Sequence, residues 1–337
     1  MLVKSVALSK QTNALQLSAL FTSYQEQFPL QLSIESNEIC LLKNAEAAIH
    51  NQVELVLFAN TTVEQLLQLT TQIDANILAI TKLNNRVGKT SFRFALDCKD
   101  IEQCKAQVNA FALCEQIEAA VIANAPSLTT PGLLVMDMDS TTIEIECIDE
   151  IAKLAGVGKE VSEVTERAML GELDFAESLR ARVAALTDAP ESILSTVGAS
   201  LPLMPGLEIL IKQLHQHNWK IAVASGGFTY FTEILKQQLN LDATQANVLE
   251  IVDGKLTGKV VGGITDAQVK ADTLLRLADE FATAKGQTVA MGDGANDLAM
   301  LSVADLGVAY KAKPVVLQQA QSSINFSGLD CLLHWLK

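Results

Sequence analysis

The chain lacks several features that mark particular classes of protein. Its six cysteines show no CxxC spacing, so a zinc site is not expected and reduced thiols are. Lysine and arginine form no basic run and the net charge is -14, which argues against nucleic-acid binding. No apolar run could span a membrane, and residues 1–21 lack the apolar core of a signal peptide. We therefore expect a cytoplasmic protein that binds neither nucleic acid nor membrane.

The length and composition favour two folded domains. The chain has 337 residues, of which 49% are apolar, so it can bury a large core. A segment rich in proline, serine, threonine and glycine at 125–132 separates two periodic regions. We place an N-terminal domain at 1–128 and a second domain at 129–337.

The N-terminal region predicts an α+β domain. From residue 53 the pattern indicates a βαββαβ order, which is the ferredoxin-like arrangement. Residues 1–45 are predicted to add a helix and a strand to it. The predicted elements are a strand at 53–59, a helix at 61–73, strands at 75–83 and 90–97, a helix at 101–117 and a strand at 119–123.

The second region predicts an α/β fold with a doubly wound parallel sheet. Short apolar runs at 133–136, 220–224 and 288–291 are each followed at once by small or acidic residues. An apolar run, a polar loop and a helix-like segment, repeated in that order, are typical of βα units. The carboxyl edge of such a sheet is where open α/β folds bind ligands.

Two insertions interrupt these units. Residues from about 144 to 203 have helical periodicity and no strand pattern, which predicts a helical cap over the sheet edge. Residues 248–261 contain Asp253 and Gly254 between alternating segments, which predicts a β-hairpin.

The segment DMDST at 137–141 carries two carboxylates directly after a buried strand. Taking a carboxylate out of water costs several kcal/mol unless a cation compensates it. A lone pair of this kind is equally compatible with an Asx turn that caps a helix. The segments that follow along the chain decide between the two interpretations.

These segments supply the other groups that phosphoryl transfer needs. Asp137, nearest the strand, is the candidate nucleophile, and Asp139 is the candidate acid and base. Ser225 and the amides of Gly226 and Gly227, at a predicted helix start, can hold a phosphate oxygen, and Lys270 supplies a positive charge. The final loop, GDGAND at 292–297, adds Asp293, Asn296 and Asp297. Carboxylate oxygens with open positions suit Mg²⁺, so we expect Mg²⁺ as the cofactor.

The set DMDST, SGGF, Lys270 and GDGAND, in that order, resembles the four motifs of the haloacid dehalogenase superfamily. The resemblance covers residues from about 133 to 310. It implies a doubly wound core with a helical cap and Mg²⁺-dependent hydrolysis of a phosphate ester through an aspartyl phosphate. The implied roles are Asp137 as nucleophile, Asp139 as acid and base, and Asp137, Asp293 and the backbone carbonyl of Asp139 as metal ligands, with Asp297 supporting.

The resemblance further implies that the substrate is O-phosphoserine, hydrolysed in the last step of serine biosynthesis. Glu146 would then bind the ammonium group and Arg182 the carboxylate, which suits their charges. Without the resemblance, a solvated helix face is the favoured interpretation of both residues. Met169 and Phe175 are expected as apolar cap contacts. The expected substrate-binding residues are Glu146, Arg182, Ser225, Gly226, Lys270 and Asn296.

Alternatives remain at the level of function. The N-terminal domain resembles the amino-acid-binding modules of the ACT type, and a structural role or a homodimer is an equal alternative. A receiver-like signalling module also uses an aspartate, Mg²⁺, a hydroxyl residue and a lysine, but Asp139 and the long cap oppose it. Another small phosphorylated metabolite, such as phosphohomoserine, is the alternative substrate.

Overall fold

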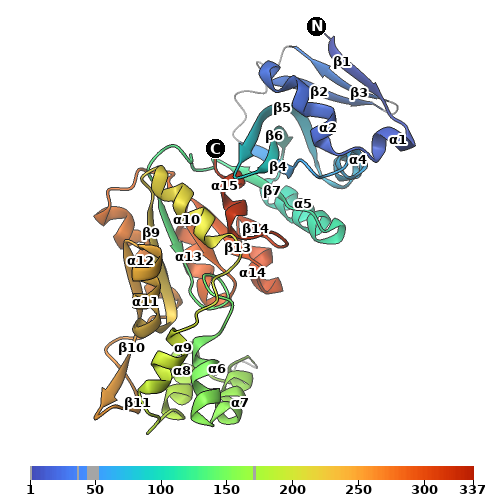
Figure 1. Cartoon of the computed structure of the whole chain (residues 1–337). Helices are drawn as coiled ribbons and strands as arrows, with labels where there is room; N and C mark the ends of the chain where they lie inside the picture. The colour runs from blue at the N-terminus through green and yellow to red at the C-terminus, as the bar shows by residue number, and fades with distance from the viewer. Residues whose placement is uncertain (1, 36–37, 44–52, 170–171) are drawn as a thin grey trace. The chain divides into compact units, whose positions relative to one another are not determined.

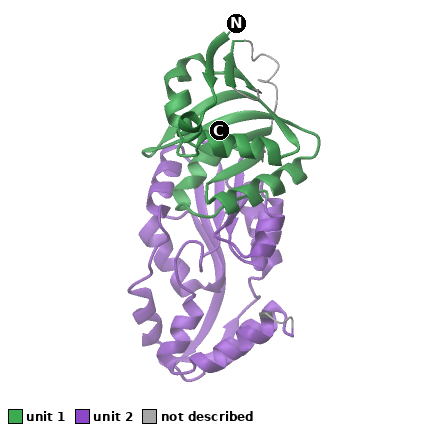
Figure 2. Cartoon of the chain, turned by 90° about the vertical axis from the view of Figure 1, so that its right-hand side faces the viewer, with its two compact units in different colours: residues 1–127, 321–337 green, residues 128–320 purple. Residues whose placement is uncertain are grey.

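The computed structural model describes residues 2–35, 38–43, 53–169 and 172–337. It divides into two compact units, coloured separately in Figure 2. Unit 1 comprises residues 1–127 and 321–337, and unit 2 comprises residues 128–320. The sequence-based division put 321–337 in the second domain, and here the structure differs.

Unit 1 is built on a seven-stranded sheet with the strand order β1-β3-β2-β5-β6-β4-β7 (Figure 1). Its paired strands run antiparallel. The elements are β1 (Leu2–Ala7), α1 (Lys10–Asn13), α2 (Leu17–Phe21), β2 (Leu30–Glu35), β3 (Glu38–Leu42), β4 (Val53–Phe58), α4 (Val63–Gln72), β5 (Ala75–Arg86), β6 (Lys89–Cys98), α5 (Ile101–Glu115), β7 (Ala119–Ala123), β14 (Ser322–Ile324) and α15 (Leu332–Trp335), with 3-10 turns at Thr22–Gln27 and Leu329–Cys331.

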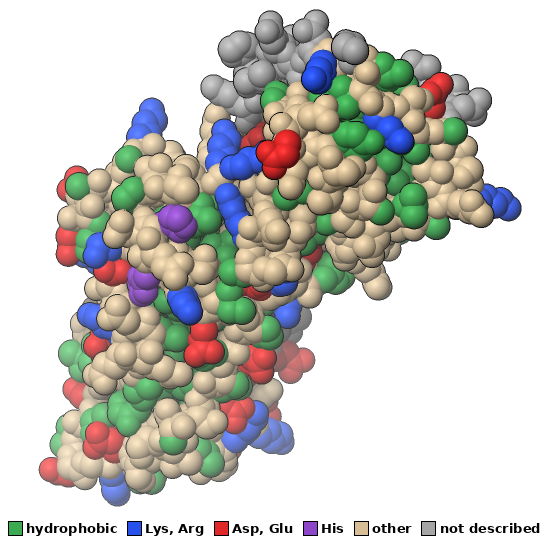
Figure 3. Space-filling model, turned by 45° about the horizontal axis from the view of Figure 1, so that its top comes forward, with side chains coloured by type: hydrophobic (Ala, Val, Ile, Leu, Met, Phe, Trp, Pro, Cys, Tyr) green, Lys and Arg blue, Asp and Glu red, His purple; other side chains and the backbone are tan. Residues whose placement is uncertain are grey.

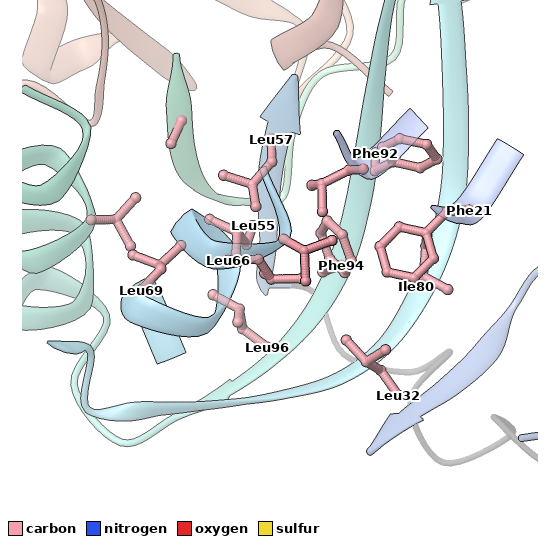
Figure 4. Close-up of a cluster of buried hydrophobic side chains, with 14 of the residues drawn as sticks. Phe21, Leu32, Leu55, Leu57, Leu66, Leu69, Ile80, Phe92, Phe94 and Leu96 are labelled. Atoms are coloured by element: carbon pink, nitrogen blue, oxygen red, sulfur yellow. The ribbon is translucent and has the colours of Figure 1, made fainter. Parts of the chain in front are cut away.

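The predicted βαββαβ order is confirmed by β4, α4, β5, β6, α5 and β7. Capping residues mark the start of both helices, α4 and α5. Thr62 and Gln65 form a capping box before α4, and the Asp100 side chain accepts from the amide of Gln103 before α5. Figure 4 shows buried side chains of the helices and strands pointing toward one another, among them Phe21, Leu32, Leu55, Leu57, Leu66, Leu69, Ile80, Phe92, Phe94 and Leu96.

Residues 1–45 hold more strand than the sequence predicted. The prediction there was one helix and one strand, whereas β1, β2 and β3 extend the sheet. Periodicity gives little guidance for such short elements, because a run of about five residues fits either period.

Buried polar contacts explain why the C-terminal segment belongs to unit 1. Arg93 is 1% exposed, pairs with Glu54 at 2.7 Å and donates to the carbonyls of Trp335 and Leu336 at 2.7 and 2.6 Å. Glu118 accepts from the amides of Phe326 and Ser327 at 2.7 and 2.6 Å, among other backbone groups of the segment. A buried charge is tolerated only when it is paired and hydrogen-bonded, so these contacts fix the segment to the sheet.

Unit 2 contains a doubly wound sheet, as predicted. Its strands follow the order β11-β10-β9-β8-β12-β13, with β8 between β9 and β12. All adjacent pairs are parallel except β10 with β11. The strands are β8 (Leu133–Met136), β9 (Lys220–Phe228), β10 (Ala243–Val252), β11 (Lys255–Val261), β12 (Thr288–Gly292) and β13 (Leu306–Tyr310). The helices outside the cap are α10 (Leu207–Gln216), α11 (Thr229–Leu239), α12 (Ala267–Glu280), α13 (Leu298–Val303) and α14 (Pro314–Gln319), with a 3-10 turn at Ala295–Asp297.

Between β8 and β9 the predicted insertion is helical. Figure 1 shows its helices gathered at one end of the sheet, near the hairpin of β10 and β11. Asp253 and Gly254 turn that hairpin at φ of 50° and 75°, which is the left-handed conformation that Asp-Gly turns adopt. The cap helices are α6 (Cys147–Ala155), α7 (Gly158–Met169), α8 (Phe175–Ala184) and α9 (Ser192–Gly198).

Among the described residues, no helix has both the length and the apolar character that a membrane crossing requires. On the face drawn in Figure 3, acidic and basic side chains are both scattered between hydrophobic and polar ones.

Candidate active site

The strand order of unit 2 places the site. After β8 the chain continues to β9 on one side, and it later reaches β12 on the other. The connections that leave the carboxyl ends of β8 and β12 therefore run in opposite directions. The gap between them is the topological switch point, where open sheets bind ligands. Asp137 follows β8 directly, and its amide donates to the carbonyl of Met291 in β12 at 2.9 Å. Asp137 thus stands at that point.

A cavity of about 780 Å³ opens at this edge of the sheet. It brings together residues that are far apart in the sequence, from the loops of the sheet and from the cap. Lys270 and Asp297 are fully buried behind it. The sequence-predicted residues that line the cavity are Asp137, Asp139, Glu146, Arg182, Ser225, Gly226, Asp293 and Asn296.

Lys270 is held between two carboxylates. Its Nζ lies 2.8 Å from Asp137 Oδ1 and 2.8 Å from Asp297 Oδ1. Burial lowers the pKa of Lys270, but the two carboxylates outweigh burial and raise it above the ordinary value. Lys270 is therefore a fixed positive charge. Asp297 also accepts from the amide of Gly294 at 2.9 Å, so both of its oxygens have partners.

Burial and the charge of Asp297 raise the pKa of Asp137 well above its usual range, and Lys270 opposes this shift. Burial and Asp297 likewise raise the pKa of Asp293 to about 6. The carboxylates at this edge thus carry more negative charge than Lys270 balances, and this surplus is what a bound cation would relieve.

The residues fit a divalent metal ion. Carboxylate oxygens of Asp137, Asp293 and Asp297 lie within 4.8 Å of one another. Such an all-oxygen set suits Mg²⁺. Because the oxygens of Asp297 bind Lys270 and Gly294, Asp137 and Asp293 are the carboxylates with room for a metal. The side chain of Asp139 is not part of this group. That Asp139 contributes its backbone carbonyl stays a prediction.

The surroundings of the Asp139 carboxyl group differ from those of Asp137. Its Oδ1 accepts from the amide of Cys147, at the start of α6, at 3.1 Å. Burial and the charge of Glu146 raise the pKa of Asp139 to about 7, although the Cys147 hydrogen bond opposes the shift. A carboxyl group with this pKa can carry a proton near neutral pH and release it, as an acid and base must.

The cap contributes Glu146 and Arg182. Glu146 is exposed and accepts from the hydroxyl of Ser140 at 2.8 Å. Arg182 lies in the last turn of α8, and its buried Nε has no hydrogen-bond partner among the described residues. Burial lowers the pKa of Arg182, while Asp149 and Glu146 oppose that shift. A buried donor without a partner is rare, and an anionic ligand would satisfy it.

The two glycines that are expected to bind phosphate lie in a strand. The prediction ended the strand at Ala224 and put Gly226 and Gly227 at a helix start, but β9 continues to Phe228 and α11 begins at Thr229. The strand is longer because Phe228 still pairs with β10. Phe175 of the cap packs at Gly226, with a ring atom 2.6 Å from where a Cβ would stand. The expected cap contact of Phe175 is thus present, whereas the side chain of Met169 lies outside the described residues.

Several residues that the sequence analysis did not single out belong to this region. Asp149 and Lys313 line the cavity, and the hydroxyl of Thr141 donates to Asp293 at 3.3 Å. Lys313 follows β13 closely and precedes Pro314 at the start of α14. Its place just after a parallel strand was the available signal, because loops at that edge build sites.

The fold and the site together define a hydrolase class that transfers a phosphoryl group to an aspartate at the end of a parallel strand. A family model for haloacid dehalogenase-like hydrolases matches residues 132–305. The chain belongs to this family.

Named relatives agree with this assignment. The chain is 61% identical to a phosphoserine phosphatase of Vibrio cholerae over 65% of this chain and 67% of that protein. A solved structure of a probable phosphoserine phosphatase from Vibrio cholerae, in unliganded form, is similar with a TM-score of 0.70 and 49% identity, covering 85% of this chain and 86% of that one. A phospho-aspartyl intermediate analogue of a phosphoserine phosphatase is similar with a TM-score of 0.58 and 38% identity, covering 62% of this chain and all of that one (100%).

Proposed function

We propose that this chain hydrolyses O-phosphoserine to serine and phosphate, in the cytoplasm, as the last step of serine biosynthesis. The observation that carries the proposal is the buried Nε of Arg182, which has no hydrogen-bond partner among the described residues and lies in the same cavity as Asp137 and Asp139. Phosphoserine has a carboxylate and an ammonium group beyond its phosphate. Arg182 and Glu146 offer the complementary charges. Relatives named phosphoserine phosphatase support the same substrate.

The chemistry follows from the two carboxyl groups. Asp137 attacks phosphorus, and the bond from phosphorus to the serine oxygen breaks as the bond to Asp137 forms. Asp139 gives its proton to the departing serine oxygen. Asp139 then takes a proton from water, whose oxygen attacks phosphorus. This step releases orthophosphate and restores the carboxylate of Asp137.

Other residues hold the reacting groups. Lys270 favours the ionised form of Asp137 that attack requires, through the 2.8 Å contact between them. Ser225, Gly226 and Asn296 would bind phosphate oxygens. Mg²⁺ would be held by Asp137, Asp293 and the carbonyl of Asp139, and when bound it would neutralise charge on the phosphate.

The test is a panel of phosphate esters assayed with Mg²⁺: phosphoserine, phosphothreonine, phosphohomoserine and sugar phosphates. We expect the highest kcat/KM on phosphoserine, loss of phosphate release with a chelator, and recovery with Mg²⁺. Acid quenching during turnover is expected to yield phosphorylated protein, and Asp137→Asn to yield none. Full activity in Asp137→Asn, or a preference for a sugar phosphate, contradicts the proposal.

A receiver-like module is the alternative from another class. It would keep its phosphoaspartate, whereas Asp139 with a pKa of about 7 favours rapid hydrolysis. The lifetime of the phosphorylated protein separates the two functions. A half-life of minutes or longer would favour the signalling module.

For unit 1 we propose an ACT-like module with a structural, dimer-forming or serine-binding role. Its ferredoxin-like strand order supports this proposal. Size-exclusion chromatography with light scattering tests the homodimer, and equilibrium dialysis with labelled serine, at a stoichiometry above one site per chain, tests binding outside the active site.

A further inference from the structure

Asn247 joins two segments that carry site residues. It lies in β10 and is 1% exposed. Its Nδ2 donates to the carbonyl of Gly226 at 2.8 Å, and its Oδ1 accepts from the amide of Thr265 at 2.8 Å. Asn247 is absent from the described lining of the cavity, so it acts through other residues.

The first of these bonds fixes a peptide group. The carbonyl of Gly226 and the amide of Gly227 belong to one planar unit. Asn247 binds the carbonyl, and Ser225 Oγ accepts from the amide at 2.8 Å. This peptide group is therefore held at both ends, which sets its orientation.

This stretch needs such external support. Side chains crowd both glycines: Phe175 Cζ would lie 2.6 Å from a Cβ at Gly226, and Met138 Cε 2.8 Å from a Cβ at Gly227. Glycine also gives the backbone the most freedom, so the sequence Gly226-Gly227 does not fix its own conformation. Asn247 supplies the missing constraint.

The second bond places the start of α12. Thr265 precedes Asp266, whose side chain caps the helix by accepting from the amide of Val269 at 2.9 Å. The amide of Lys270 donates to the carbonyl of Asp266 at 3.0 Å, in the first turn of the helix. One side chain thus relates Gly226, whose own amide would bind phosphate, to the helix that carries Lys270.

We propose that Asn247 is a positioning residue for the phosphate group: by binding the carbonyl of Gly226 it aligns the Gly226 backbone, whose own amide would bind phosphate, with Lys270. The inference rests on the proposed phosphatase function. Asparagine suits the role because its amide offers a donor and an acceptor on one plane. Aspartate would keep the bond to Thr265 and lose the one to Gly226, and leucine would lose both.

The experiment compares Asn247→Leu and Asn247→Asp with the control Gln245→Ala. Gln245 lies on the same strand and reaches the same residue, but only through a side-chain contact with Thr265 Oγ1 at 3.2 Å. Steady-state kinetics on phosphoserine are combined with product inhibition by orthophosphate and by serine. Thermal unfolding verifies that each variant is folded.

A buried carbonyl without a donor should weaken phosphate binding roughly tenfold to a hundredfold. We expect the inhibition constant for orthophosphate to rise by that factor in both Asn247 variants, with a comparable fall in kcat. The inhibition constant for serine, bound by Glu146 and Arg182, should stay within about twofold. Gln245→Ala should match the wild type in all three measurements.

Two outcomes overturn the proposal: unchanged orthophosphate inhibition in a folded Asn247 variant, or equal losses for orthophosphate and serine. If Asn247→Leu does not fold, Asn247→Asp decides alone, because it keeps the volume and the bond to Thr265. A wild-type chain that fails to hydrolyse any phosphate ester would instead refute the proposed function.

Discussion

Arg182 gives the sharpest test of how the substrate is recognised. Its buried Nε has no partner among the described residues, and it lies in the same cavity as Asp137. If it binds the carboxylate of phosphoserine, Arg182→Ala removes a charge-assisted contact in a partly buried site. Truncating one partner of such a pair costs about 3 to 4 kcal/mol. At about 1.4 kcal/mol per factor of ten, kcat/KM should fall roughly 10²- to 10³-fold.

The assay uses a second substrate that lacks the carboxylate. Phosphoethanolamine keeps the phosphate and the ammonium group, so the wild-type enzyme already lacks the Arg182 contact with it. Arg182→Ala should change kcat/KM for phosphoethanolamine by no more than about threefold. Arg182→Lys keeps the charge but not the planar fork of the guanidinium. Its kcat/KM on phosphoserine should lie between the values of the wild type and Arg182→Ala.

Arg180 provides the matched control. It lies on the same helix, α8, and is exposed, so Arg180→Ala removes the same charge without changing the cavity. We expect nearly wild-type kinetics on both substrates. Equal losses on phosphoserine and phosphoethanolamine in Arg182→Ala, or a similar loss in Arg180→Ala, would refute the reasoning.

Three further predictions follow from buried or isolated charges. Lys270→Met leaves two buried carboxylates without their cation, so the unfolding free energy of the metal-free protein should fall by about 3 to 5 kcal/mol. An unchanged thermal unfolding transition would contradict this prediction. Lys313→Gln should lower kcat/KM and weaken the dependence of kcat/KM on salt concentration. Lys311→Gln makes the same change in net charge but should alter neither, since of these two lysines only Lys313 lines the acidic cavity. Burial lowers the pKa of His334 from 6.5 to about 3, and the charge of Arg86 is the second cause. The unfolded chain therefore binds the extra proton, and unit 1 should lose stability as pH falls from about 6.5 toward 3, by at most about 1.4 kcal/mol per pH unit, with a flatter profile in His334→Asn.

Much of the fold could be predicted because its signals are local. The strand of 133–136 is continuously apolar, as a strand buried on both faces must be, and its polar successors mark the carboxyl edge. The capping residues before α4 and α5 act within one turn of the helix. The end of β9 was predicted wrongly for the opposite reason. Its last residues are held in the strand by pairing with β10, and glycines give no local sign of that partner.

The same distinction applies to the site. Order and spacing along the chain indicated the residues that we propose carry the chemistry: two carboxylates after a strand, a serine before glycines, a lysine and an acidic loop. The carboxylates and the acidic loop were the clearest signals, because a strand end is a fixed place on a sheet. Tertiary structure alone decided that Asp297 holds Lys270, that Asn247 braces Gly226 and that Arg93 retains the C-terminal segment in unit 1. Such contacts join residues tens or hundreds of positions apart, and a hydrogen bond depends on where the folded chain brings two atoms, which no local pattern encodes.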